Sequence, residues 1–424
     1  MDSIEDYTKL YDGHWENSLP GNPYEGVLTN YTDDLLFSME RLSNSPYQVQ
    51  RLNPQTDSLN FQVGNSITKK LTTMTQQQLF DAGRLFYADY RDQSVLSPTP
   101  GHHAAACDAF FYIHPTTSAF LPLAIRTNIG ANLIYTPADT PQDWTLAKMM
   151  YNVNDFWFAQ WNHLASTHEV VQIGYMAAIR SLSEEHPVLA LLNRLMYEVF
   201  AVQPAAALIL FSMGGAVDLL FPYDGTSARD YTTRLYETGG SGRFQGNYFE
   251  RELERRGLVG SKEFPALKHF PFYEDGLRIH SAIRSFMASF VDSYYSEDSD
   301  LGDDNELQNW AGECNGDANC IDFPTSFTSK DTLVDVLTHF AHLASVSHQT
   351  VNTNELLQVS STLPMHPPSL YSPLPSSKGV TNVADYLPSL PQCLAQFTVG
   401  ALFARPKLFG VSPDQLCSAT VRMD

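Results

Sequence analysis

The stretch "WNHLASTHEVVQIGYMAAIRSLSEEHPVLALL", residues 161–192, places two histidines, His163 and His168, five positions apart. It belongs to a proline-free run over 144–182, which predicts one long helix. On a regular α-helix, at about 100° per residue, these two side chains would point about 140° apart. An inserted π-type turn advances about 80° per residue, so that the two histidines converge. The spacing therefore predicts an i→i+5 turn near residues 164–167.

A second informative segment is 331–352, "DTLVDVLTHFAHLASVSHQTVN". Its apolar residues recur at helical spacing, and the same stripe continues onto His348 and Asn352, which are four apart and converge on a helix face. Buried imidazole and amide groups need partners. Two helices with convergent pairs would give three imidazoles and one amide oxygen, a set that suits Fe or Mn better than structural zinc. The alternative is that each histidine is a hydrogen-bonded core residue.

The remaining segments predict a mainly α-helical protein with a small β element. Residues 107–128 read as two strands of a hairpin, and further helices are expected at 188–202 and 276–294. Residues 1–73 are polar and interrupted by prolines, which predicts an extended lead-in that could contain one short helix. No linker divides residues 74–424, so we expect one domain there.

Composition narrows the classes of function. The formal net charge of −21 opposes binding to nucleic acid, and no apolar stretch approaches the length of a membrane span. The first residues lack the pattern of a secretory signal, so the chain as given is expected to be cytoplasmic. Five cysteines imply no disulfide framework, and only Cys314 and Cys320 are candidates for a pair.

Four motifs resemble the catalytic domain of the lipoxygenase family, especially its fungal branch. They occur in family order, and the resemblance extends from about residue 74 to 410; the motifs are "DWTLAK" (143–148), "NDFWFAQWNHLASTHEVV" (154–171), "RSLSEEHPVLALL" (180–192) and "HQTVN" (348–352). The resemblance implies a multi-helix domain around two central metal-bearing helices. It also implies that His163, His168, His348 and Asn352 bind one non-haem iron, with manganese as the alternative.

The function implied by the resemblance is a dioxygenase reaction. Its substrates would be O2 and a polyunsaturated fatty acid of the linoleate or linolenate type, and hydrogen abstraction at the bis-allylic methylene would lead to a hydroperoxide. Oxygen entry in the family depends on a small residue in the stretch that corresponds to "LFSMGGAVD" (210–218), where Gly214 is the expected position. Met213 or Gly215 could align instead, and a turn glycine with positive φ is an equal alternative.

The family also uses the carboxylate of its final residue, usually isoleucine, as a ligand. This sequence ends in Asp424, so we expect the C-terminal part of the catalytic domain to be incomplete and metal binding to be weak. Two other functions follow from the same resemblance. One is a lipoxygenase-like protein that binds lipid without turnover, and the other is an enzyme that isomerises fatty-acid hydroperoxides.

Overall fold

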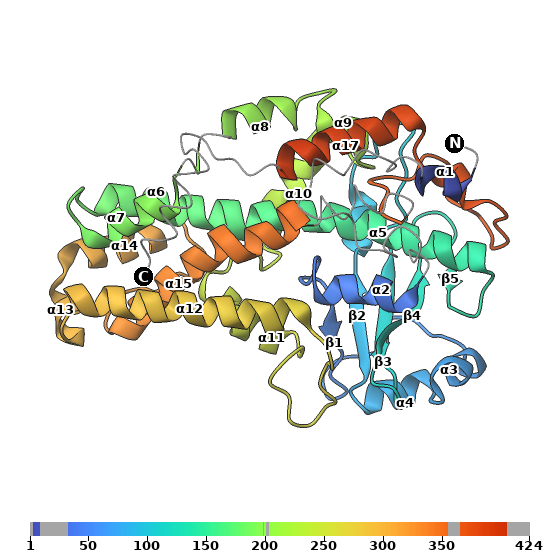
Figure 1. Cartoon of the computed structure of the whole chain (residues 1–424), viewed down its shortest axis with the longest axis horizontal. Coiled ribbons are helices and arrows are strands. Elements are labelled where there is room, and N and C mark those ends of the chain that lie inside the picture. The colour runs from blue at the N-terminus through green and yellow to red at the C-terminus, as the bar shows by residue number, and fades with distance from the viewer. Residues whose placement is uncertain (1–2, 9–32, 198, 201–202, 355–364, 405–424) are drawn as a thin grey trace.

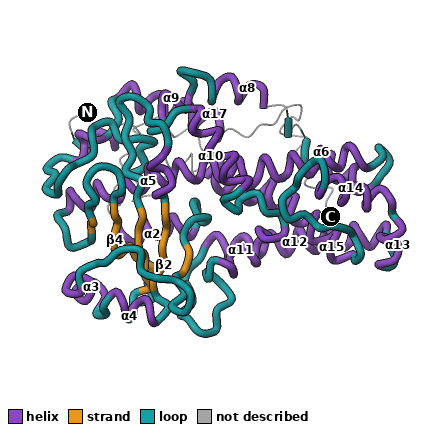
Figure 2. Tube along the Cα trace, turned by 180° about the vertical axis from the view of Figure 1, so that it is seen from behind, coloured by secondary structure: helices purple, strands orange, loops and turns teal. Residues whose placement is uncertain are grey.

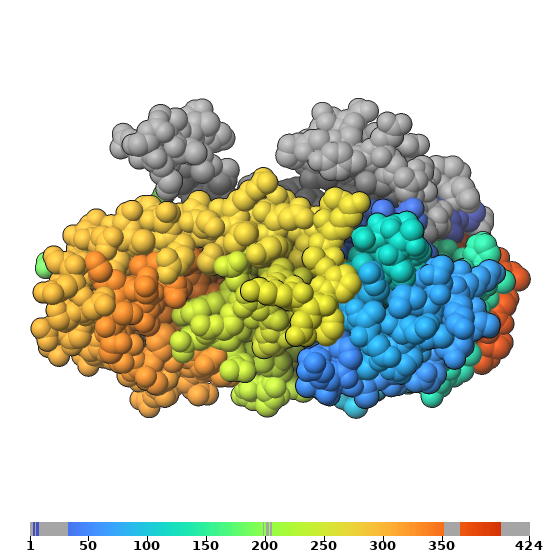
Figure 3. Space-filling model, turned by 90° about the horizontal axis from the view of Figure 1, so that it is seen from below, coloured from blue at the N-terminus to red at the C-terminus, as the bar shows by residue number. Residues whose placement is uncertain are grey.

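The computed structural model describes residues 3–8, 33–197, 199–200, 203–354 and 365–404. The molecule is mainly helical with one small antiparallel sheet, as predicted. The sheet lies at one end of the elongated molecule and a bundle of helices at the other (Figures 1 and 2). In the space-filling view, the yellow and orange residues of the bundle and the blue residues of the sheet region occupy opposite ends (Figure 3).

The sheet is a five-stranded antiparallel meander whose strands pair in sequence order. Its strands are β1 (Gln50–Arg51), β2 (Leu85–Asp89), β3 (Asp108–Ile113), β4 (Phe120–Arg126) and β5 (Ile134–Tyr135). The predicted hairpin is confirmed as β3 and β4, which pair from Asp108 opposite Arg126 to Ile113 opposite Phe120. Because side chains alternate across a strand, Phe111 faces the main core, while Phe110 faces a smaller cluster.

The lead-in differs from the expected extended segment. Its described part contains α1 (Ile4–Thr8), α2 (Asp34–Met39), β1 and α3 (Asn65–Thr72). Asp33 caps α2, and Phe37 on that helix stacks on Phe111 of the sheet. These short elements form because tertiary packing supplies the stability that a proline-interrupted polar segment lacks by itself. The division of the chain at residue 73 stays a prediction.

The long helix predicted over 144–182 is present as three consecutive pieces. They are α5 (Pro141–His163), the π-helix Leu164–Glu169 and α6 (Val170–Ser181). The predicted i→i+5 turn is therefore confirmed. Thr140 caps the start of α5 and Pro141 occupies its first turn, which are common features of a helix N-terminus. Nearly every residue of α5 is buried, so this helix passes through the centre of the protein (Figure 1).

The helix that carries His348 departs from the regular helix predicted over 331–352. It begins as α15 (Lys330–His342) and continues as two π-helical segments, Leu343–Ser347 and Gln349–Asn354, on either side of His348. The prediction of regular α-helix was wrong beyond His342. The four-residue spacing of His348 and Asn352 already converges on a regular helix, so it gave no reason to expect further π turns.

Helices pack around this pair at the bundle end. The predicted helix 276–294 lies within α12 (Pro271–Tyr294), and the helix predicted over 188–202 ends earlier, as α7 (Pro187–Leu195). The other α-helices are α4 (Gln76–Asp81), α8 (Gln203–Ile209), α9 (Ala216–Leu220), α10 (Gly225–Glu237), α11 (Phe249–Arg255), α13 (Asp298–Asp303), α14 (Asn305–Asn315) and α17 (Leu390–Ala404). Among the described residues, no helix has both the length and the apolar character needed to cross a bilayer.

The crossing of α6 and α15 is close at Gly174. A Cβ atom at this position would lie 2.6 Å from the ring of Phe340, and the Gly174 carbonyl accepts a hydrogen bond of 3.0 Å from the Trp310 indole. We expect Gly174→Ala to lower the free energy of unfolding by about 1–3 kcal/mol, because overpacking forces the helices apart. Chemical denaturation of the two proteins measures this difference.

Gly312 in α14 is the matched control, since a Cβ atom there would meet nothing within 4 Å. We expect Gly312→Ala to leave stability unchanged or raise it by up to about 1 kcal/mol, because alanine is the better helix former. Equal effects of the two substitutions would contradict a close contact at Gly174.

Candidate metal centre

Three of the four predicted ligands come together where the two central helices meet. His163 ends α5, His168 lies in the following π-helix, and His348 lies between the two π segments of the second helix. One ring nitrogen from each lies within 4.8 Å of the others, and the Nε2 atoms of His168 and His348 are 2.8 Å apart. The convergence predicted from the five-residue spacing is therefore present.

The electrostatics of this triad fit a transition-metal ion. Burial, followed by the neighbouring His168 and His348, holds the pKa of His163 well below its usual value, so its ring is neutral and offers a lone pair. Nitrogen ligands about 2.1 Å from one ion lie about 3–3.4 Å from each other at octahedral or tetrahedral angles. The triad nitrogens all lie within 4.8 Å of one another, so small side-chain shifts would let the three rings share one ion.

The fourth predicted ligand is only partly described. The backbone of Asn352 lies in the π-helix Gln349–Asn354, while its side chain lies outside the described residues. Asp424, whose carboxylate was considered at the sequence level, also lies outside them. The geometry of the centre therefore rests on the three histidines.

Serine hydroxyls donate at equivalent places in two of the three π segments, Leu164–Glu169 and Leu343–Ser347, which we call the two π turns. The Ser166 hydroxyl donates to the carbonyl of Asn162 (2.7 Å), and the Ser345 hydroxyl donates to the carbonyl of Ala341 (2.6 Å). Such a hydroxyl contact to the carbonyl four residues earlier adds a second donor to a helical carbonyl and also occurs in regular helix, as at Ser281 and Ser289 in α12. Sequence analysis missed the signal for the second turn, which is the repetition of "HLAS" at 163–166 and 342–345.

Gln160 links the two helices that carry the histidine triad and was also missed. Its buried side-chain amide, one turn before His163, donates to the carbonyl of Val351 (3.3 Å), the residue before Asn352. The main-chain carbonyls of Gln160 and Ala159 raise the pKa of His163, because they favour a proton on its ring. This effect opposes the larger effect of burial, which lowers the pKa. Gln160 therefore fixes the helix that carries His163 against the peptide group that precedes Asn352, the expected fourth ligand.

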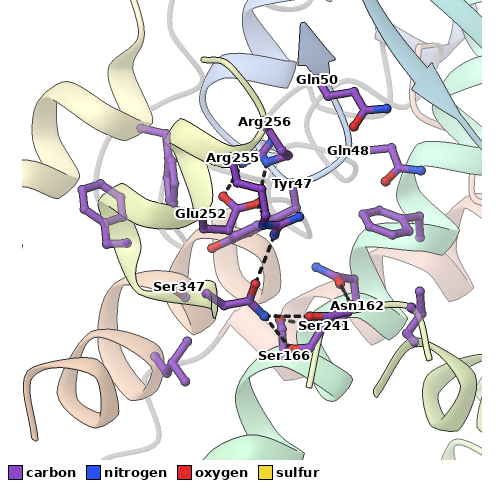
Figure 4. A pocket seen from close by; sticks show the side chains of 18 of the residues that line it. Tyr47, Gln48, Gln50, Asn162, Ser166, Ser241, Glu252, Arg255, Arg256 and Ser347 are labelled. Carbon is purple, nitrogen blue, oxygen red and sulfur yellow. Dashed lines mark hydrogen bonds and ion pairs between the residues drawn. The ribbon is translucent and has the colours of Figure 1, made fainter. Parts of the chain in front are cut away.

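A cavity of about 350 Å³ lies beside both π turns (Figure 4). Asn162 and Ser166 line it from the first turn, and Leu343 and Ser347 line it from the second. Among its charged groups, Glu252 pairs with Arg256 (Figure 4), while Asp89 and Asp92 pair with Arg91 and Arg234 outside the lining. The lining mixes polar groups with apolar side chains such as Phe158, Phe249 and Phe272.

Two other buried histidines lie on the helix that carries His348 but outside the triad. His342 lines the cavity, and its ring packs against Phe249 and His280. Burial, with a smaller contribution from His280, lowers the pKa of His342 to about 3. His339 packs against Phe244 and is likewise held neutral by burial.

Gly214, the expected oxygen-channel residue, lies in an exposed turn with φ of +74°. A Cβ atom there would meet nothing within 4 Å, whereas one at Gly215 would lie 2.7 Å from the carbonyl oxygen of Ile209. The turn alternative raised from the sequence therefore accounts for a glycine at position 214. Its role in oxygen entry stays a prediction.

Known proteins match both the sequence and the fold of this chain. A lipoxygenase family model matches residues 40–394. Manganese lipoxygenases of Fusarium oxysporum (strain Fo5176) and Colletotrichum gloeosporioides (strain Cg-14) are 48% and 45% identical over 410 residues, with 96% of this chain and 67% of each relative covered. The solved structure of manganese lipoxygenase of Gaeumannomyces graminis is 42% identical with a TM-score of 0.92, with 98% of this chain and 76% of that chain covered. The chain spans about two thirds of the length of these curated relatives and belongs to the lipoxygenase family.

Proposed function

We propose that the chain is a manganese-dependent dioxygenase that adds O2 to a polyunsaturated fatty acid of the linoleate or linolenate type and forms a hydroperoxide. The observation that carries the proposal is the convergence of three imidazoles between two central helices, with burial holding the pKa of His163 well below its usual value. Iron was the first expectation from the sequence, but relatives at 45–48% identity are named manganese lipoxygenases and favour manganese. The histidines themselves suit either metal.

The residues of the chain have separate roles in this proposal. His163, His168 and His348 would hold the ion, and the amide of Asn352 would be the weaker fourth ligand. When bound, the ion would supply the one-electron oxidant needed to remove a hydrogen atom from the bis-allylic methylene. Ala165, between the first two histidines, is fully buried in the main core, so this side of the turn packs against the protein interior.

The direct test is a reaction of the metal-loaded protein with linoleate. We expect O2 uptake together with an increase in conjugated-diene absorbance, in equal molar amounts, because each O2 added leaves one conjugated diene. Linoleate binding without either signal would favour the lipid-binding alternative. Consumption of a fatty-acid hydroperoxide without O2 uptake would favour the isomerase alternative.

Removing one imidazole should separate metal binding from folding. We expect His348→Ala to lose at least about 10–100-fold in manganese affinity while keeping the helical circular-dichroism spectrum, because ligand loss should cost no less than loss of an outer-shell contact. Metal per chain, measured by plasma mass spectrometry, gives the result. His269→Ala removes an exposed histidine and serves as the control. Unchanged stoichiometry in His348→Ala would identify His348 as a core histidine only.

The contact between Gln160 and the second helix gives a further prediction. We expect Gln160→Leu to weaken manganese binding by about 10–100-fold and to change the Mn(II) EPR line shape, because the peptide before Asn352 loses its hydrogen bond. Gln172→Leu is the matched control, since Gln172 is equally buried and its amide also donates to a carbonyl, that of Val199 at 3.1 Å. Identical EPR spectra and affinities for the two variants would limit Gln160 to a general packing role.

A further inference from the structure

The chain reverses direction directly after α14 and brings two cysteines together. Cys314 lies in the last turn of this helix, and the backbone N–H of Cys320 donates to the carbonyl oxygen of Cys314 at 2.7 Å. With standard covalent geometry, this hydrogen bond limits the separation of the two Cα atoms to about 6.6 Å. Disulfides span Cα separations of about 4.4–6.8 Å, so the backbone already satisfies this requirement.

The reversal is fixed by the backbone of the turn. The N–H of Ala318 bonds to the carbonyl of Glu313, and the N–H of Gly316 bonds to the carbonyl of Gly312. Asn319 adopts a positive φ of 52°, which completes the turn just before Cys320. The two cysteines are therefore held together by local structure that does not depend on flexible side chains.

The two side chains are also directed toward each other. Both are buried, and both are free thiols in this structure. A hydrogen bond with the Cys320 thiol, followed by burial, raises the pKa of the Cys314 thiol well above its usual value. The other described cysteines, Cys107 and Cys393, lie on different elements, next to β3 and in α17. Among the described cysteines, only Cys314 and Cys320 combine a short backbone contact with a thiol–thiol contact.

We propose that Cys314 and Cys320 form an intramolecular disulfide by thiol–disulfide exchange. The oxidant is a disulfide such as oxidised glutathione or an oxidised oxidoreductase. A thiolate of the pair attacks it and releases one thiol, and the second cysteine then displaces the mixed disulfide and releases the other. One disulfide is reduced to two thiols for each protein disulfide formed, and the two protons of the protein thiols end on the released thiols.

Burial places the reaction before folding is complete, because the attacking group must be an accessible thiolate. Such a bridge persists in oxidising compartments. It would therefore place maturation of the chain in such a compartment, in contrast to the cytoplasmic expectation from the sequence. Structurally, the bridge would anchor the end of α14, whose Trp310 contacts Gly174 in the helix that follows His168.

The test uses the full chain. It follows one tryptic peptide that contains both cysteines, because trypsin does not cut between them. Residues 285–330 contain both cysteines and no internal lysine or arginine. The chain is refolded with reduced and oxidised glutathione, trapped with a thiol-blocking reagent, denatured, and digested. We expect this peptide to be lighter by the mass of two hydrogen atoms and to take up two labels only after reduction. The peptides of Cys107 and Cys393 should be labelled without reduction.

Two results would overturn the proposal. One is labelling of both Cys314 and Cys320 in the denatured, unreduced wild-type chain, and the other is glutathione bound to either of them in place of the internal bridge. The wild-type measurement needs no variant, so it remains decisive even where a variant misfolds. In Cys320→Ser, the label should appear on Cys314, and the reductant-induced fall in melting temperature expected for the wild type should disappear.

Discussion

Three imidazoles can meet between these helices only because the backbone departs from regular α-helix around them. His163 and His168 would diverge on a regular helix, and the inserted π turn restores their convergence. That departure displaces main-chain hydrogen bonds inside a buried segment, where an unpaired carbonyl is costly. The Ser166 and Ser345 hydroxyls donate to the carbonyls of Asn162 and Ala341 at the start of two of these segments and add side-chain hydrogen bonds where the helix becomes irregular.

The rest of the fold can be understood as cover for two irregular helices that must stay buried. The sheet and α2 enclose the beginning of α5, while α12 and α14 pack against α15 and α6 at the opposite end (Figure 1). Gln160 joins the two helices next to the histidines, and Trp310 joins α14 to α6. Both contacts place a side-chain donor on a main-chain carbonyl, which fixes helix position without adding charge to the core.

Sequence reasoning reached the first π turn because a five-residue spacing leaves one convergent geometry. It missed the second turn because His348 and Asn352 also converge on a regular helix. The lead-in was misjudged for a different reason: α2 depends on packing against Phe111 and Tyr151, which are distant in sequence. Iron and manganese could not be separated from residue types, since both accept the same nitrogen and oxygen donors.

The two "HLAS" turns show how one residue of spacing decides whether a histidine enters the centre. Each turn begins with a histidine, His163 or His342, and each is followed by a second histidine after five or six positions respectively. At about 80° per residue in a π turn, five steps bring the second ring within about 40° of the first, whereas six steps leave about 120° between them. His342 is therefore directed away from His348 and packs against Phe249 and His280 beside the cavity. The same local backbone thus places a histidine in the triad in one helix and a neutral cavity-lining histidine in the other.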